Sequence, residues 1–97
     1  MEARWTGTVE PPDIAVEVIS KTNRTHDRVR KRRFYARVRI PEYWIVDPEE
    51  KSIEVLALIE GGLSYRSVGW YTSGDIARSS GFELAIAVDD VFALPDD

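Results

Sequence analysis

The sequence contains no cysteine and a single histidine, His26. The lack of cysteine excludes disulfide bridges and zinc–thiolate sites and fits a protein of a reducing compartment. The single histidine excludes a metal site built on two histidines. No apolar run approaches the roughly 18 residues that span a bilayer, and the N-terminus lacks the apolar core of a signal peptide. We therefore expect a cytoplasmic protein that does not associate with membranes.

No glycine-rich phosphate loop is present either. Gly61-Gly62 and Gly74 are isolated turn glycines. By contrast, 43% of the 97 residues are hydrophobic, and three Trp, four Tyr and three Phe are among them. This content predicts a single globular domain over residues 1–97.

Positive charge is concentrated in one segment of an otherwise acidic chain. The formal net charge is −4, yet nine of the thirteen basic residues lie between Lys21 and Arg39, where Asp27 is the only acid. Such a patch favours an anionic ligand, of which phosphate is the commonest. The alternative is a solvated helix face that neutralises acids elsewhere on the fold. The nine residues are Lys21, Arg24, Arg28, Arg30, Lys31, Arg32, Arg33, Arg37 and Arg39.

The hydrophobic pattern predicts one helix among several strands. The helix covers about Asp27 to Val38, with Thr25 as its N-cap, and Pro41 ends it. Strands are expected at about 4–9, 14–19, 43–46, 52–59, 64–71, 76–78 and 82–86, with a terminal helical turn at 89–93. The order of strand, helix, strand and meander predicts an α+β fold with one crossover helix.

Glu17 is the one acid in the apolar run Ile14–Ile19. In a strand its own face also carries Ala15 and Ile19, and the opposite face is apolar throughout. Both faces of this strand are therefore expected to be covered. An acid inside such a strand is costly to bury unless it is paired or binds a cation. Two interpretations stay open, an ion pair with the next helix and a ligand or catalytic role.

Asp27, Lys31 and Tyr35 follow one another at four-residue steps, so they lie along one stripe of the predicted helix. Taken alone, this stripe reads as a surface ion pair beside a packed aromatic ring, worth about 0.3–0.5 kcal/mol. Tyr43, Trp44 and Trp70 lie on strand patterns, and we expect them in the core.

Three motifs in a row carry a resemblance to a known family. They are Pro12-Asp13-Ile-Ala-Val-Glu17-Val-Ile-Ser20, then Asp27-x3-Lys31-x3-Tyr35, then Ile40-Pro41-Glu42-Tyr-Trp-Ile-Val-Asp47-Pro48. In this order and at these spacings they closely resemble the Uma-type restriction endonuclease family, part of the PD-(D/E)XK nuclease superfamily. The similarity continues more loosely to the C-terminal end, so it covers about residues 12–95.

The resemblance implies a restriction-endonuclease-like mixed sheet and a Mg²⁺-dependent (or Mn²⁺-dependent) DNA endonuclease. Glu17 matches the metal-binding acid of the (D/E)XK strand. Ile19 stands where the motif lysine would be, and Lys31 on the following helix resembles its migrated substitute, with Asp27 and Tyr35 in support. In that scheme the cation helps to activate water and stabilises charge at the scissile phosphate. The residues expected to bind nucleic acid are Lys21, Arg24, Arg28, Arg30, Arg32 and Arg33.

The chain departs from the family pattern in two places that matter. Family members carry an upstream strand with the first metal-binding aspartate, so the resemblance implies a domain truncated at the N-terminus. Asp13 does not replace that aspartate, because four residues of strand span about 13 Å, while Mg²⁺ ligands lie at about 2.1 Å. Arg39 stands where the family usually has a helix-ending glycine, and an arginine in the left-handed conformation costs on the order of 1 kcal/mol.

Three functions remain open on the sequence alone. The first is a metal-dependent nuclease, incomplete or inactive as this chain alone. The second is a non-catalytic relative of that fold whose basic face binds nucleic acid or a partner chain. The third is a module that dimerises to cover an exposed sheet edge.

Overall fold

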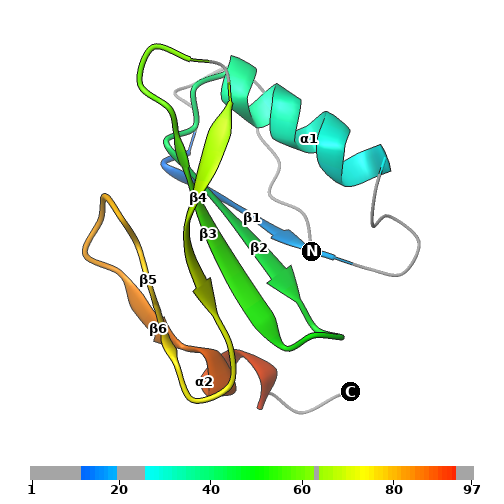
Figure 1. The fold of residues 1–97 in the computed structure, drawn as a ribbon, viewed down its shortest axis with the longest axis vertical. Helices are drawn as coiled ribbons and strands as arrows, with labels where there is room; N and C mark the ends of the chain where they lie inside the picture. Colours follow the sequence, from blue (N-terminus) through cyan, green and yellow to red (C-terminus); the bar gives the residue numbers. More distant parts are fainter. Residues whose placement is uncertain (1–11, 20–25, 63, 94–97) are drawn as a thin grey trace.

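The computed structural model describes residues 12–19, 26–62 and 64–93 (Figure 1). The predicted strand at 4–9, the N-cap Thr25, and the candidate residues Lys21 and Arg24 lie outside the described residues. The elements are β1 (Ile14–Val18), α1 (His26–Arg37), β2 (Glu42–Asp47), β3 (Ser52–Leu58), β4 (Tyr65–Tyr71), β5 (Ile76–Arg78), β6 (Ala85–Ala87) and α2 (Val88–Phe92).

Strands β1 to β4 form one mixed sheet in the order β1-β2-β3-β4, and β5 and β6 form a separate antiparallel pair. β1 and β2 are parallel, with Glu17 opposite Ile45, and α1 is the crossover between them. β2, β3 and β4 follow as an antiparallel meander. The predicted α+β fold with a single crossover helix and a mixed sheet is confirmed.

Two apolar clusters fill the two faces of the sheet. On the α1 face, Ala15 and Ile19 of β1 pack with Tyr35 and Ala36 of α1 and with neighbouring side chains of β2 to β4. On the other face, Trp44, Val46 and Ile53 and their neighbours pack with residues of β5, β6 and α2. Figure 1 shows α1 on one side of the sheet and the β5–β6 hairpin with α2 toward the other end of the molecule.

The C-terminus of α1 is closed by a Schellman motif. The amide of Ile40 donates to the carbonyl of Tyr35, and the amide of Arg39 donates to the carbonyl of Ala36, both at 3.1 Å. This motif requires a left-handed residue, and Arg39 has φ 64°. The backbone strain expected at Arg39 is confirmed.

Glu42 ties the end of the β5–β6 hairpin to the start of β2. Trp44 Nε1 donates to its Oε1 at 2.7 Å. Its Oε2 accepts from the Ser79 hydroxyl and from the backbone amides of Ser80 and Gly81, at 2.9–3.0 Å. Burial alone would raise the pKa of Glu42, but these hydrogen bonds outweigh that effect and leave the pKa below its ordinary value. Glu42 is therefore a fully paired, structural carboxylate.

Two expectations about burial were wrong. Trp70 is 59% exposed, although Tyr43 and Trp44 are buried as predicted. Trp70 lies on the edge strand β4 opposite Glu54, where a strand pattern alone does not show how far the covering helix extends. Val16 and Val18, on the β1 face that points away from α1, are 38% and 37% exposed, so that face of β1 is only partly covered.

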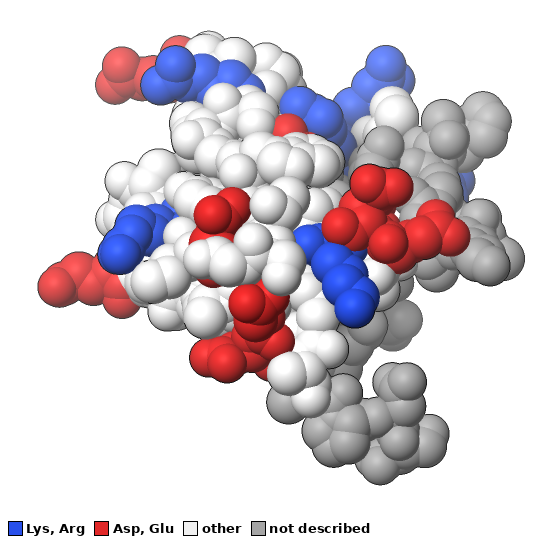
Figure 2. Space-filling view, turned by 60° about the horizontal axis from the view of Figure 1, so that its bottom comes forward, with Lys and Arg blue, Asp and Glu red and all other residues white. Residues whose placement is uncertain are grey.

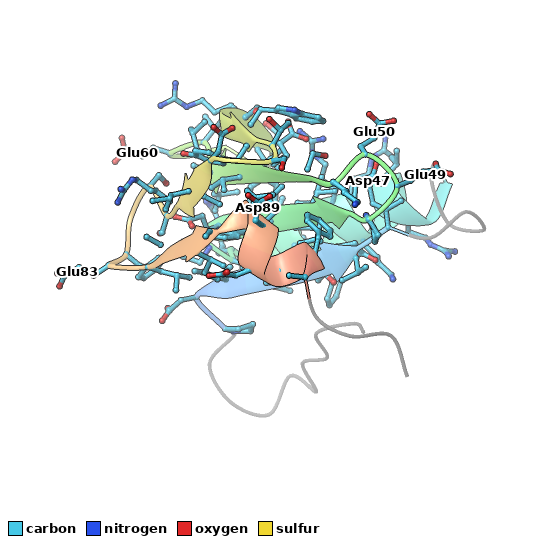
Figure 3. All side chains as sticks on the ribbon, turned by 90° about the horizontal axis from the view of Figure 1, so that it is seen from below. Asp47, Glu49, Glu50, Glu60, Glu83 and Asp89 are labelled. Atoms are coloured by element: carbon cyan, nitrogen blue, oxygen red, sulfur yellow. The ribbon has the colours of Figure 1, made fainter. Side chains whose placement is uncertain are left out.

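Acidic side chains lie on several elements. Seen from below, Asp47, Glu49 and Glu50 crowd the β2–β3 turn, and Asp89 lies on α2 (Figure 3). The face in Figure 2 shows acidic and basic side chains interspersed among uncharged ones. Within the described residues, no helix is long and apolar enough to cross a membrane.

Candidate metal and phosphate site

Glu17 lies on the α1 face of β1 and is only 4% exposed. The strand alternation that places Ala15 and Ile19 in the core beneath α1 places Glu17 there too. Lys31 of α1 reaches down to it, and Lys31 Nζ lies 3.0 Å from Glu17 Oε2. The structure thus brings the two predicted catalytic residues together as a buried ion pair. This contact is the ion pair of the first interpretation, and the ligand or catalytic role of Glu17 stays a prediction.

The second oxygen of Glu17 distinguishes this pair from an ordinary structural ion pair. Oε1 is buried and accepts no hydrogen bond from any residue that the structure describes. An unpaired buried carboxylate oxygen carries its full desolvation cost. A divalent cation would satisfy it, because carboxylate oxygen is the ligand that Mg²⁺ prefers.

The described residues supply one such ligand and no more. They contain no group of three acidic or histidine side chains that could hold a metal ion. Mg²⁺ is commonly held by one or two carboxylates, with water and substrate phosphate as its other ligands. Glu17 therefore fits a Mg²⁺ ligand, as part of a donor set that these residues alone do not complete.

Tyr35 is buried at 6% exposure and belongs to the core rather than to an open site. Its ring packs edge-on against Tyr43, with centroids 5.2 Å apart. Tyr43 in turn packs against Tyr65, whose hydroxyl donates to the carbonyl of Ile40 at 2.6 Å. This aromatic group fixes α1 on the sheet and so holds Lys31 above Glu17. Tyr35 is thereby suited to the supporting role predicted for it.

The remaining predicted residues differ in their exposure and in how far the structure describes them. Asp27 and Arg28 lie in the first turn of α1, and the description does not extend to their side chains. Arg30 and Arg33 are exposed on α1, whereas Arg32 is partly buried. Arg32 Nη2 donates to the carbonyl of Tyr65 at 3.3 Å, which directs this side chain toward β4 and away from Glu17.

Two carboxylates that the sequence analysis did not single out lie on the same sheet face as Glu17. The register runs from Glu17 to Ile45 and on to Glu54, and Asp47 follows two residues after Ile45. Asp47 Oδ1 accepts from the amides of Glu49 and Glu50, so it organises the β2–β3 turn. The alternation of residues within β2 and β3 could have shown that these two carboxylates share a face with their apolar neighbours. Only the pairing of the strands shows that this face also carries Glu17.

Comparisons with known proteins bear on the family and the fold. The family model Uma2, described as "Putative restriction endonuclease", matches residues 2–89. The fold is similar to a crystal structure of a putative nuclease belonging to DUF820 from Anabaena variabilis, with a TM-score of 0.64 at 14% sequence identity. The match covers 84% of this chain and 44% of that one, so this chain spans less than half the length of that protein. No curated protein matches the sequence significantly.

Proposed function

Because this chain belongs to the Uma2 restriction endonuclease family, we propose that it takes part in metal-dependent hydrolysis of phosphodiester bonds in DNA. In this proposal Glu17 is a ligand of Mg²⁺ or Mn²⁺, and Lys31 positions water or the scissile phosphate. Tyr35 supports Lys31 by fixing α1, and Asp27 supports it from the same helical stripe. We expect the protein to act in the cytoplasm.

The observation that carries the proposal is the unequal pairing of the two Glu17 oxygens. Oε2 binds Lys31 at 3.0 Å, whereas buried Oε1 has no hydrogen-bond donor among the described residues. A purely structural carboxylate is expected to have both oxygens satisfied, because an unpaired buried acceptor costs about 1–3 kcal/mol. Ligation of a cation by Oε1 would remove that cost.

Each group would have a distinct part in the chemistry. A bound divalent cation supplies charge stabilisation at the phosphate and lowers the pKa of a ligated water. Lys31 brings a positive charge next to that position, and its amine can donate to a phosphate oxygen. Hydrolysis adds water across one P–O bond of the backbone. We propose that the complete site takes at least one further acidic ligand from outside the described residues.

Plasmid cleavage tests the proposal. The protein is incubated with supercoiled plasmid and Mg²⁺ or Mn²⁺, beside the variants Glu17→Gln and Lys31→Met. We expect any metal-dependent nicking to disappear in both variants, while Asp13→Asn, at an exposed acid immediately before the same strand, keeps it. Nicking that survives both substitutions would come from a contaminant and would refute the assignment.

A second candidate function, a non-catalytic dimerisation or nucleic-acid-binding module, is favoured by the exposed edge of β1. β1 is the outer strand of the four-stranded sheet in the described residues. Beside it lies a groove of about 320 Å³ whose lining is entirely apolar and includes Val16, Val18 and Leu84. An open strand edge next to an apolar surface favours pairing with another strand.

We propose a second copy of this chain as the partner at that edge, because antiparallel pairing of β1 about Val16 sets Ile14 opposite Val18 of the other copy. Sedimentation of the wild type and of Val16→Lys tests this. A wild-type dimer that becomes monomeric in the variant supports the module, and a wild-type monomer excludes it. DNA binding without cleavage, lost at high salt, would support the nucleic-acid-binding form.

A further inference from the structure

A pocket separate from Glu17 lies between α1 and the beginning of β4. It is lined by Val29, Arg32, Arg33 and Ser64 and has a volume of about 350 Å³. We refer to these four residues as the arginine pocket. Two guanidinium groups and a hydroxyl lie there with one apolar side chain, and none of the described lining residues is an acid.

The two arginines differ in how firmly they are held. Arg32 is partly buried, and its Nη2 donates to the carbonyl of Tyr65 at 3.3 Å, so its guanidinium is fixed at the wall of the pocket. Arg33 is exposed and makes no hydrogen bond or ion pair with the residues that the structure describes. One positive group is therefore pre-positioned, and the other is available to a ligand.

The arginine pocket and the Glu17–Lys31 pair lie toward opposite edges of the four-stranded sheet. Glu17 is on β1, while Tyr65, which accepts from Arg32, begins β4 at the other edge of the sheet. Three strand spacings separate these edges. Across the sheet, Glu17 is aligned with Ile45, Glu54 and Trp70 in turn. Trp70 lies five residues beyond Tyr65 in β4. Lys31 and Arg32 are consecutive residues of α1, so the ammonium of one and the guanidinium of the other are separated by no more than the two side-chain lengths plus the ~3.8 Å between their Cα atoms.

We propose that the arginine pocket binds a phosphate group of the nucleic-acid backbone other than the scissile phosphate. Guanidinium donors match phosphate oxygens bidentately, and the Ser64 hydroxyl adds a further donor. This inference rests on the proposed function for the choice of nucleic acid over free phosphate, which shares the same chemistry.

The test measures binding of a fluorescently labelled duplex oligonucleotide in EDTA, where metal-dependent cleavage does not contribute. Arg33→Gln removes the available guanidinium. Arg37→Gln is the matched control, because Arg37 is an exposed arginine on the same helix and outside the pocket. We expect Arg33→Gln to weaken binding roughly tenfold at low salt and to reduce the salt slope by about 0.9, while Arg37→Gln changes neither appreciably.

Equal effects of the two substitutions would overturn the proposal, because they would show general attraction to a basic helix. Failure of the wild type to bind the oligonucleotide would overturn it as well. Titration with inorganic phosphate at constant ionic strength distinguishes the two sources of the ligand. Phosphate binding that Arg33→Gln abolishes, without oligonucleotide binding, would assign the pocket to a free anion and refute the nucleic-acid form. Weaker oligonucleotide binding by Arg33→Gln would support the pocket even if Glu17→Gln left metal binding unchanged. That second result would refute only the proposed metal site.

Discussion

Glu17 and Glu42 are buried acids on neighbouring parallel strands, and they differ in how their oxygens are paired. Glu42 is 1% exposed, and both of its oxygens accept hydrogen bonds, from Trp44 on one side and from residues 79–81 on the other. Glu17 is 4% exposed, and only Oε2 is paired, with Lys31. Burial is nearly the same for the two side chains, so burial does not separate their roles.

The difference lies in the kind of partner that each carboxylate has. Glu42 is satisfied by neutral donors that belong to a turn, and this arrangement favours the ionised form and needs nothing further. Glu17 has one fixed cation and one oxygen that the described fold leaves without a donor. A buried polar atom without a partner needs an explanation, and a bound ion is one that fits a carboxylate oxygen. We therefore interpret Glu42 as structural and Glu17 as part of a binding site.

The largest expected effect comes from removing the structural acid. Glu42→Ala leaves the indole of Trp44 and the donors of residues 79–81 without their acceptor, so we expect a loss of about 3 kcal/mol in the free energy of unfolding. Urea denaturation measures it. Glu83→Ala, at an exposed glutamate in the same hairpin, serves as the control and should change stability by less than about 0.5 kcal/mol. Equal stabilities of the two variants would contradict the structural role of Glu42.

A smaller effect is expected at the other acid. Lys31→Met removes a hydrogen bond to a charged, buried carboxylate and should cost about 2 kcal/mol. Combining it with Glu17→Gln should restore most of that loss, because the unpaired charge is then gone. Urea denaturation of the single and double variants provides the cycle. A double variant that is less stable than Lys31→Met would show that Glu17 stabilises the fold in the way that Glu42 does.

The pH dependence of stability provides a further test of the structural role of Glu42. The pKa of Glu42 in the folded protein lies below its ordinary value of 4.5. Its stabilising contribution is therefore fully present above pH 4.5 and is lost as the pH falls through the folded pKa. We expect the urea midpoint of the wild type to fall more steeply below pH 4.5 than that of Glu42→Gln. Parallel pH profiles would contradict the assignment of a lowered pKa to Glu42.

The smallest expected effect is at Arg39, which links the Glu17 region to the Glu42 region. Arg39 joins α1, which carries Lys31, to the strand that begins with Glu42, and it does so at φ 64°. Arg39→Gly should stabilise the protein by about 1 kcal/mol, because glycine adopts this conformation without a Cβ clash. Arg33→Gly, at an exposed position inside the helix, should instead destabilise it by about 1 kcal/mol. Thermal unfolding that shows the same sign for both would refute the strain at Arg39.

Local patterns in the sequence predicted most of the Glu17 region. The alternation around Glu17 and the four-residue steps from Asp27 to Tyr35 were sufficient to expect a strand followed by a crossover helix. The left-handed conformation of Arg39 was expected from the family resemblance, because a helix-ending glycine usually stands at that position. These features depend on neighbours within one or two turns of the chain, which is why the sequence reveals them.

The Glu42 region could not be predicted in the same way. Its partners at residues 79–81 lie 37–39 residues away along the chain. Trp70 was predicted to be buried because a strand pattern does not show where a covering helix stops. The arginine pocket required the contact between Arg32 and Tyr65, 33 residues apart. Such long-range relations are set by the packing of α1 and the hairpin on the sheet.

Binding of Mn²⁺ tests the central claim most directly, because it needs neither DNA nor turnover. Electron paramagnetic resonance follows free Mn²⁺ during titration of the wild type, Glu17→Gln and the exposed-acid control Asp13→Asn. We predict that the wild type and Asp13→Asn bind the ion alike and that Glu17→Gln binds it at least about tenfold more weakly, a difference of about 1.4 kcal/mol. Equal binding by the wild type and Glu17→Gln would show that Glu17 is not a metal ligand and would contradict the account.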